Sequence, residues 1–147
     1  MIIEYHSELD VRFSTNADCG RRWKLITPFP FSVDGRRWEA PASFWTDFAS
    51  IPRFIWPVVS PYEIGKGPVP HDLGYYLGVE SKSYWDEVLL ACMEHEKIDR
   101  WKRRPVYRAV HLFGWKAWNF YRESRKTSEQ LLAKIDSRNI LETTAIT

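Results

Sequence analysis

The spacing of hydrophobic residues along this chain changes near residue 69. Before that point the apolar residues form short β-favouring runs, such as Ile2-Ile3 and Val11 to Phe13. After it they recur every three or four residues, which is the period of an amphipathic helix. The pattern predicts an α+β fold in a single domain spanning 1–125. A C-terminal helix or partly flexible tail follows at 126–147, and "NILETTAIT" at its end shows no pattern.

The domain divides into a β-rich part (1–45), a Pro-rich loop (46–68) and a helical core (69–125). The stretch "WKLITPFPFSVDGRRWEAPASF" carries the turn dipeptide Asp34-Gly35 between two β-favouring runs, so it predicts a β-hairpin. Pro28 and Pro30 favour an edge or irregular strand in the first arm. The loop contains four prolines but enough apolar residues to pack down, and long packed loops are often functional.

Three helices are expected in the core. The first runs from Val69 to Leu77 and ends at Gly78, a good C-cap residue. The second runs from about Ser83, a plausible N-cap, to Lys97. The third runs from after Asp99 to about Arg122. Since proline is tolerated in the first helical turn, Pro105 suggests that the regular part of this helix begins near Arg104.

Composition narrows the function classes. Two cysteines without a CxxC pair argue against a thiolate metal site and a disulfide framework, and a net charge of +2 implies no specific nucleic-acid binding. The N-terminus lacks a signal peptide, and no run of 18 apolar residues predicts a transmembrane segment. We expect a cytoplasmic protein, or one carried within a virion. For the basic cluster "DRWKRRP", a solvated helix entrance is favoured over contact with anionic lipid or nucleic acid.

Polar residues on the first two helices form a candidate catalytic pair. His71 and Tyr75 are four residues apart and share a helix face, while Asp86 lies on the apolar stripe of the second helix. A buried carboxylate needs a partner, and a short connection makes the two helices antiparallel neighbours, so His71 should face Asp86. A carboxylate that fixes one imidazole nitrogen leaves the other to take a proton from water. The alternative is a capping aspartate and a hydrogen-bonded core histidine.

Two further aspartates suggest a metal site. Asp47 opens the Pro-rich loop, and with Asp72 it offers hard oxygen ligands that suit Ca²⁺. Equally, Asp47 would cap a turn in "TDFAS". Ser50 is a candidate nucleophile in a triad with His71 and Asp86, although a turn hydroxyl before Ile51-Pro52 is the favoured interpretation.

These residues lie in phrases that carry a family resemblance. The phrases "HDLGYYL", "WDEVLLACMEH" and "YRAVHLFG" resemble the helical core of prokaryotic phospholipase A₂, and "WTDFAS" resembles its calcium loop. The series "FWTDFASIP", "HDLGYY" and "WDE" is similar to a family of small phage and prophage proteins of unknown function, over residues 41–115. The disulfides and glycine-rich calcium loop of the phospholipase family are absent, and the loop between the first two helices is shorter.

The resemblance implies a fold and a set of roles. The fold would be a phospholipase A₂-like bundle of about three helices. His71 would act as general base, Asp86 would orient it, and Tyr75 would support Asp86. Asp47, Asp72 and the Phe48 carbonyl would bind Ca²⁺.

Two functions are therefore expected, from different classes. The first is a metal-assisted hydrolase acting on a lipid or another ester. The alternative is a non-enzymatic virion or tail-associated assembly protein whose partners are phage structural proteins.

Overall fold

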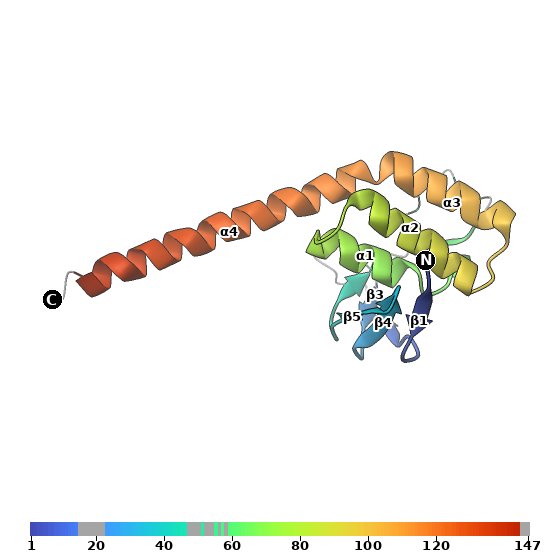
Figure 1. Ribbon diagram of the computed structural model, residues 1–147, viewed down its shortest axis with the longest axis horizontal. Helices are drawn as coiled ribbons and strands as arrows, with labels where there is room; N and C mark the ends of the chain where they lie inside the picture. The colour runs from blue at the N-terminus through green and yellow to red at the C-terminus, as the bar shows by residue number, and fades with distance from the viewer. Residues whose placement is uncertain (15–22, 47–50, 52–54, 56, 58, 145–147) are drawn as a thin grey trace.

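A computed structural model describes residues 1–14, 23–46, 51, 55, 57 and 59–144, with the backbone alone described at 61, 62 and 131–144. Within these residues the fold is α+β, as predicted, with six strands in two small sheets and four α-helices (Figure 1). The strands are β1 (Ile3–Tyr5), β2 (Val11–Phe13), β3 (Trp23–Leu25), β4 (Phe29–Val33), β5 (Arg36–Ala40) and β6 (Trp45–Thr46). The helices are α1 (Pro68–Leu77), α2 (Lys82–His95), α3 (Arg100–Phe113) and α4 (Trp115–Thr144), preceded by a 3₁₀ turn, η2 (Pro61–Ile64).

Both sheets are antiparallel and three-stranded, with orders β1-β4-β5 and β2-β3-β6. The predicted hairpin is confirmed as β4-β5, and its turn residues Asp34 and Gly35 have φ of 48° and 78°. These positive values are the conformation that a two-residue type I′ turn requires.

The edge-strand prediction for the first arm is wrong, because β4 lies in the centre of its sheet with Pro30 inside it. The last paired residues of β1 and β4 are Tyr5 and Phe31, and beyond them His6 N donates to Pro30 O at 3.0 Å. In an antiparallel strand the N–H and C=O of one residue point the same way. The missing N–H of Pro30 therefore faces the very end of the β1 ladder, where little pairing is lost.

Capping residues mark the end of α1 and the start of α2. Gly78 ends α1 in the left-handed conformation (φ 61°), as expected. The N-cap of α2 is Ser81, whose hydroxyl accepts from Tyr84 N, so the predicted cap at Ser83 is wrong by two residues. The delayed start of α3 is also wrong. It begins at Arg100 with Pro105 inside, and the carbonyl that Pro105 leaves without a helical donor belongs to Trp101, which is exposed to water.

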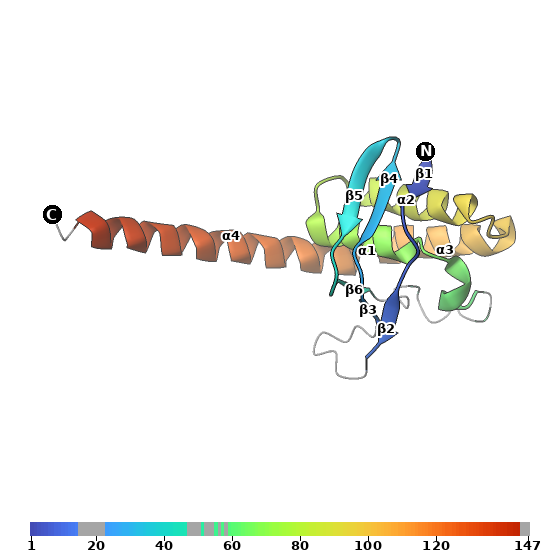
Figure 2. The same ribbon diagram turned by 90° about the horizontal axis from the view of Figure 1, so that it is seen from below.

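The helices lie in layers over one sheet (Figures 1 and 2). α1 and α2 pack against β1, β4 and β5, and α3 packs on α2 on the side away from the strands. Phe29, Phe31 and Val33 alternate along β4 and are all buried in the main core. A second buried cluster includes Val59 and Ile64 from the Pro-rich loop, which confirms that its described part packs down.

A close contact sets the distance between α1 and α2. A Cβ at Gly74 would collide with the indole of Trp85, which is fully buried. The glycine at this position therefore allows α1 to approach α2 at the level of His71 and Asp86. Close backbone approach of this kind is a characteristic use of glycine.

The third predicted helix is in fact two helices separated at Gly114. The second of these, α4, continues to Thr144 through the segment expected to be a helix or partly flexible tail, and it extends far beyond the body of the molecule (Figure 1). Near its base, Arg125 donates hydrogen bonds of 2.8 Å to the carbonyls of both Tyr75 and Tyr76, at the end of α1. Among the described residues, no helix has both the length and the apolarity to cross a membrane.

Candidate functional site

The structure brings His71, Tyr75 and Asp86 together between α1 and α2. His71 Nε2 lies 3.3 Å from Asp86 Oδ1, and the Tyr75 hydroxyl donates to the same oxygen at 2.7 Å. The Tyr75 ring also lies against the imidazole, with 4.2 Å between ring centroids. Helical spacing explains the arrangement, because residues four apart on α1 reach the same point on α2.

The other oxygen of Asp86 is held by residues that the sequence analysis missed. Lys82 Nζ donates to Asp86 Oδ2 at 2.7 Å, and His111 Nδ1 lies 3.2 Å from the same oxygen. Lys82 Nζ also donates to the carbonyls of Val110 and His111, at 3.2 and 2.9 Å. One buried carboxylate thus connects α1, α2 and the C-terminal end of α3.

Both missed residues left a trace in the sequence. Lys82 lies four residues before Asp86, a spacing that allows an ion pair on one helix face. His111 belongs to the phrase "YRAVHLFG", whose final glycine also matters. A Cβ at Gly114 would lie 2.6 Å from the Tyr75 hydroxyl and 3.2 Å from Lys82 Cε, so a side chain there would press on the site.

Asp72 faces His71 from the opposite side of the imidazole. Its Oδ1 lies 3.6 Å from His71 Nδ1, and its Oδ2 accepts a 2.8 Å hydrogen bond from Thr46 Oγ1. Thr46, which is fully buried on β6, was also missed, although it lies within the phrase "WTDFAS". The imidazole of His71 is therefore placed between two carboxylates, one near each ring nitrogen.

Burial and charge shift the pKa values of this group in defined directions. Burial by itself would lower the pKa of His71, but the Asp72 and Asp86 carboxylates outweigh it, so the net pKa is raised. Burial would raise the pKa of Asp86, but interactions with His71, Lys82 and Tyr75 outweigh it and lower the pKa. For Tyr75, burial and the adjacent Asp86 carboxylate both raise the pKa, so its hydroxyl remains a donor.

The site is closed to solvent except at His111. His71 and Asp72 are 3% and 4% exposed and Asp86 is fully buried, whereas the His111 side chain is 44% exposed. Lys82 and a protonated His71 would balance the two buried carboxylates. Buried charges are tolerated in proteins when they are paired and hydrogen-bonded in this way.

The remaining predicted site residues, Asp47, Phe48 and Ser50, lie outside the described residues. The part of the chain that the structure describes contains no group of three His, Cys, Asp or Glu side chains able to hold a metal ion. Of the residues predicted to bind calcium, it describes Asp72, whose hydrogen-bond partner Thr46 directly precedes Asp47 in the sequence.

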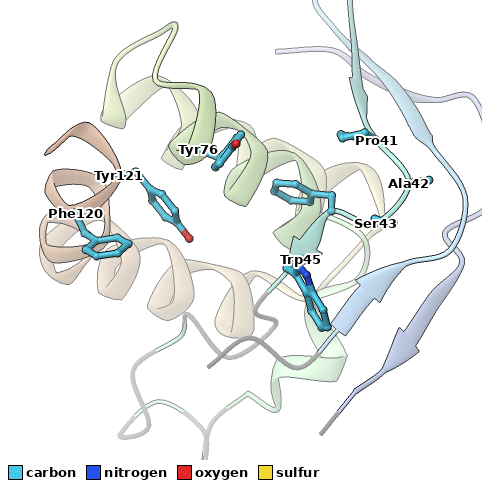
Figure 3. A pocket seen from close by; sticks show the side chains of 8 residues that line it. Pro41, Ala42, Ser43, Trp45, Tyr76, Phe120 and Tyr121 are labelled. Carbon is cyan, nitrogen blue, oxygen red and sulfur yellow. The ribbon is translucent and has the colours of Figure 1, made fainter. Parts of the chain in front are cut away.

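An aromatic cavity adjoins this cluster (Figure 3). Its volume is about 490 Å³, and it lies between the β5-β6 connection, the end of α1 and the base of α4. The lining residues are Pro41, Ala42, Ser43, Phe44, Trp45, Tyr76, Phe120 and Tyr121. A second hollow of about 320 Å³ shares Tyr76 and Tyr121 and is bordered by Arg125.

The cavity and the buried cluster are lined by neighbouring residues of the same two elements. On β6, Trp45 lines the cavity while Thr46 binds Asp72. On α1, Tyr76 lines the cavity while Tyr75 binds Asp86. Successive residues of a strand point to opposite faces, and successive helical residues are turned by about 100°, so adjacent residues serve the two sites.

Comparison with known proteins gives a family without a described activity. No curated protein and no solved structure matches the chain. Residues 23–110, which include β3 to β6, α1, α2 and most of α3, match the family described as "Protein of unknown function (DUF1353)". This match spans more than half of the sequence and contains His71, Asp72, Tyr75, Lys82 and Asp86. The chain therefore belongs to the DUF1353 family.

Proposed function

We propose that this protein is a hydrolase that uses His71 to activate water against an ester. The observation that carries the proposal is the placement of the His71 imidazole 3.3 Å from Asp86, which Tyr75 and Lys82 hold in turn. With Nε2 donating to Asp86, Nδ1 carries the lone pair that accepts a proton, and because His71 is only 3% exposed, water and ester would reach Nδ1 when the site opens. A histidine oriented by a buried carboxylate in this way is a common general base.

The reaction balances with His71 as the only proton carrier. Nδ1 takes a proton from water as the water oxygen attacks the carbonyl carbon, which forms a tetrahedral oxyanion. The bond from carbon to the leaving oxygen then breaks, and the imidazolium returns its proton to the departing alkoxide. Asp86 stabilises the imidazolium between these steps, which agrees with the raised pKa of His71.

Calcium remains part of the proposal through Asp72. Asp72, Asp47 and the Phe48 carbonyl would hold the ion, which would polarise the ester carbonyl and stabilise negative charge on its oxygen. The hydrogen bond between Thr46 and Asp72 supports this set, since it joins the residue that precedes Asp47 to the helix ligand. A phospholipid is the substrate that the phospholipase A₂ resemblance suggests, and the aromatic cavity would accept its apolar part.

The test is hydrolysis of phospholipid vesicles and of simple aryl esters, each with Ca²⁺ or with EDTA. His71→Ala should lower the rate by about 10²–10⁴-fold. The matched control is His95→Ala, since His95 is an exposed histidine on α2 outside the cluster. Since a neutral imidazole is needed, kcat/KM should rise with pH through a midpoint above 6.5, the ordinary pKa of histidine. A wild-type protein that hydrolyses no ester under either condition contradicts the proposal.

One observation favours a second, non-enzymatic function. Asp86 is fully buried and its cluster ties three helices together, as a purely structural ion pair would, while α4 extends away from the body. An assembly role in a phage particle would use the cluster for rigidity and α4 for contact. Under this alternative, His71→Ala lowers the free energy of unfolding but changes no hydrolytic rate, because there is none to change.

A further inference from the structure

We infer that the outer face of α3 binds anionic lipid bilayers. We define this face by Arg100, Trp101, Arg104, Arg108 and Leu112, which the structure leaves exposed. At 100° per residue they lie within one third of the helix circumference. The inference does not depend on hydrolysis, since it concerns a surface separate from the His71 cluster.

The charged residues of α3, apart from its histidine, are all basic. The helix contains five Arg and Lys residues and no Asp or Glu. Two of the five turn toward the body and are neutralised there. Lys102 Nζ lies 2.7 Å from Glu63, and Arg103 lies 3.2 Å from Glu94.

The other three cations face water. Arg100, Arg104 and Arg108 follow one another at intervals of four residues, and none of them forms an ion pair with any residue that the structure describes. Glu63 and Glu94 therefore pair with the two cations of α3 that face the body of the protein. What remains is a row of three guanidinium groups with no carboxylate partner among the residues that the structure describes.

Large apolar side chains stand at both ends of this row. Trp101 is 61% exposed at the first turn and Leu112 is 66% exposed at the last. Phe113 and Trp115 are also exposed, at 57% and 51%, but they lie outside the face as defined. Large apolar side chains exposed beside a row of cations are typical of a contact surface.

An anionic bilayer matches both features of the face. Arg side chains pair with phosphate groups, while tryptophan and leucine enter the boundary between headgroups and acyl chains. Nucleic acid would satisfy the guanidinium groups but would leave Leu112 in water. α3 also lies on the outer side of the helical layer, away from the strands (Figure 1).

The test is co-sedimentation of the full chain with vesicles. One set contains phosphatidylcholine alone and the other adds phosphatidylglycerol. Binding should require phosphatidylglycerol and should weaken as salt rises, since exposed charges are screened within about 8 Å at physiological ionic strength. Arg104→Glu with Arg108→Glu should weaken binding by at least about tenfold.

Two further variants keep the test decisive. Arg122→Glu with Lys126→Glu makes the same change of charge on the exposed part of α4, and this control should retain binding. Leu112→Ser should weaken binding even at low salt, where the charges still attract. Circular dichroism and urea unfolding establish that each variant is folded. Equal binding to both vesicle types, loss of binding in the α4 control, or binding to duplex DNA but not to vesicles would each overturn the inference.

Discussion

Lys82 and Asp86 form a buried ion pair one turn apart on α2, with Nζ 2.7 Å from Oδ2 and both residues at most 3% exposed. Together, the two members of the pair also bind groups on α1 and α3. The same ammonium satisfies two carbonyls at the end of α3, and the same carboxylate receives Tyr75 and faces two histidines. Whatever the protein does, this pair organises the three helices around it.

Lys82→Met should therefore be strongly destabilising. It leaves Asp86 without its cation and the Val110 and His111 carbonyls without a donor. Breaking a buried pair in this way costs about 3–5 kcal/mol in the free energy of unfolding. Urea unfolding measures the loss, and Lys102→Met, which breaks the surface pair with Glu63, should change little. Equal losses in the two variants would mean that the buried pair has no special role.

Stability should pass through a plateau in mildly acidic solution. The folded pKa of His71 is raised above 6.5, so its contribution is complete below pH 6.5 and is lost as pH rises through the folded pKa. The folded pKa of Asp86 is lowered below 3.8, so its contribution is complete above pH 3.8 and is lost as pH falls through the folded pKa.

Urea unfolding at a series of pH values measures this profile. His71→Gln should remove most of the decline on the alkaline side, while His95→Gln, at an exposed position, should leave the profile unchanged. If the alkaline limb survives in His71→Gln, another group causes it and the charged state assigned to His71 is wrong.

The contact between Gly114 and Tyr75 predicts an unusual alanine effect. Gly114 has φ −66° and ψ −10°, a helical conformation in which alanine is normally preferred by about 1 kcal/mol. We expect Gly114→Ala to destabilise instead, because its Cβ would lie 2.5 Å from Val110 O and 2.6 Å from the Tyr75 hydroxyl, and only the second contact involves a side chain that can be shortened. In a Tyr75→Phe background the penalty should shrink. A double-mutant cycle by urea unfolding measures the coupling, and strictly additive effects would refute the contact.

The sequence predicted the contacts between neighbouring helices but not those between elements far apart along the chain. Helical spacing placed His71 and Tyr75 on one face and Asp86 opposite them, because those relationships involve a helix and its immediate neighbour. His111 approaches Asp86 from a third helix, and no local spacing encodes the packing of α3 on α2. Lys82 escaped notice because a lysine near a helix start is ordinarily solvated.

In the fold, too, local features were predicted and pairings between distant segments were not. The hairpin at Asp34-Gly35 and the end of α1 at Gly78 follow from residues that favour a positive φ, so they could be read directly. The central place of β4 could not, because it depends on pairing with β1, which is distant in sequence. Similarly, the sequence analysis did not pair β2 with β3, which lie on either side of residues 15–22.

Cys92 should be chemically silent in the folded protein. It is fully buried beneath the sheet, and burial raises the pKa of its thiol to about 12. Because the thiolate is the reactive form, Ellman's reagent should not label Cys92 until the protein unfolds. A Cys19→Ser variant isolates its signal. Labelling of this variant in native buffer at the rate seen in urea would show that the core opens far more readily than its packing implies.

The hydrogen bonds from Arg125 attach α4 to the end of α1. One guanidinium grips the last carbonyls of α1, at the base of a helix whose far end, Thr144, stands well clear of the body. The part of α4 nearest the body is therefore attached to the chain at Tyr75. A force on the far end of α4 would therefore act first on the end of α1, the helix that carries His71.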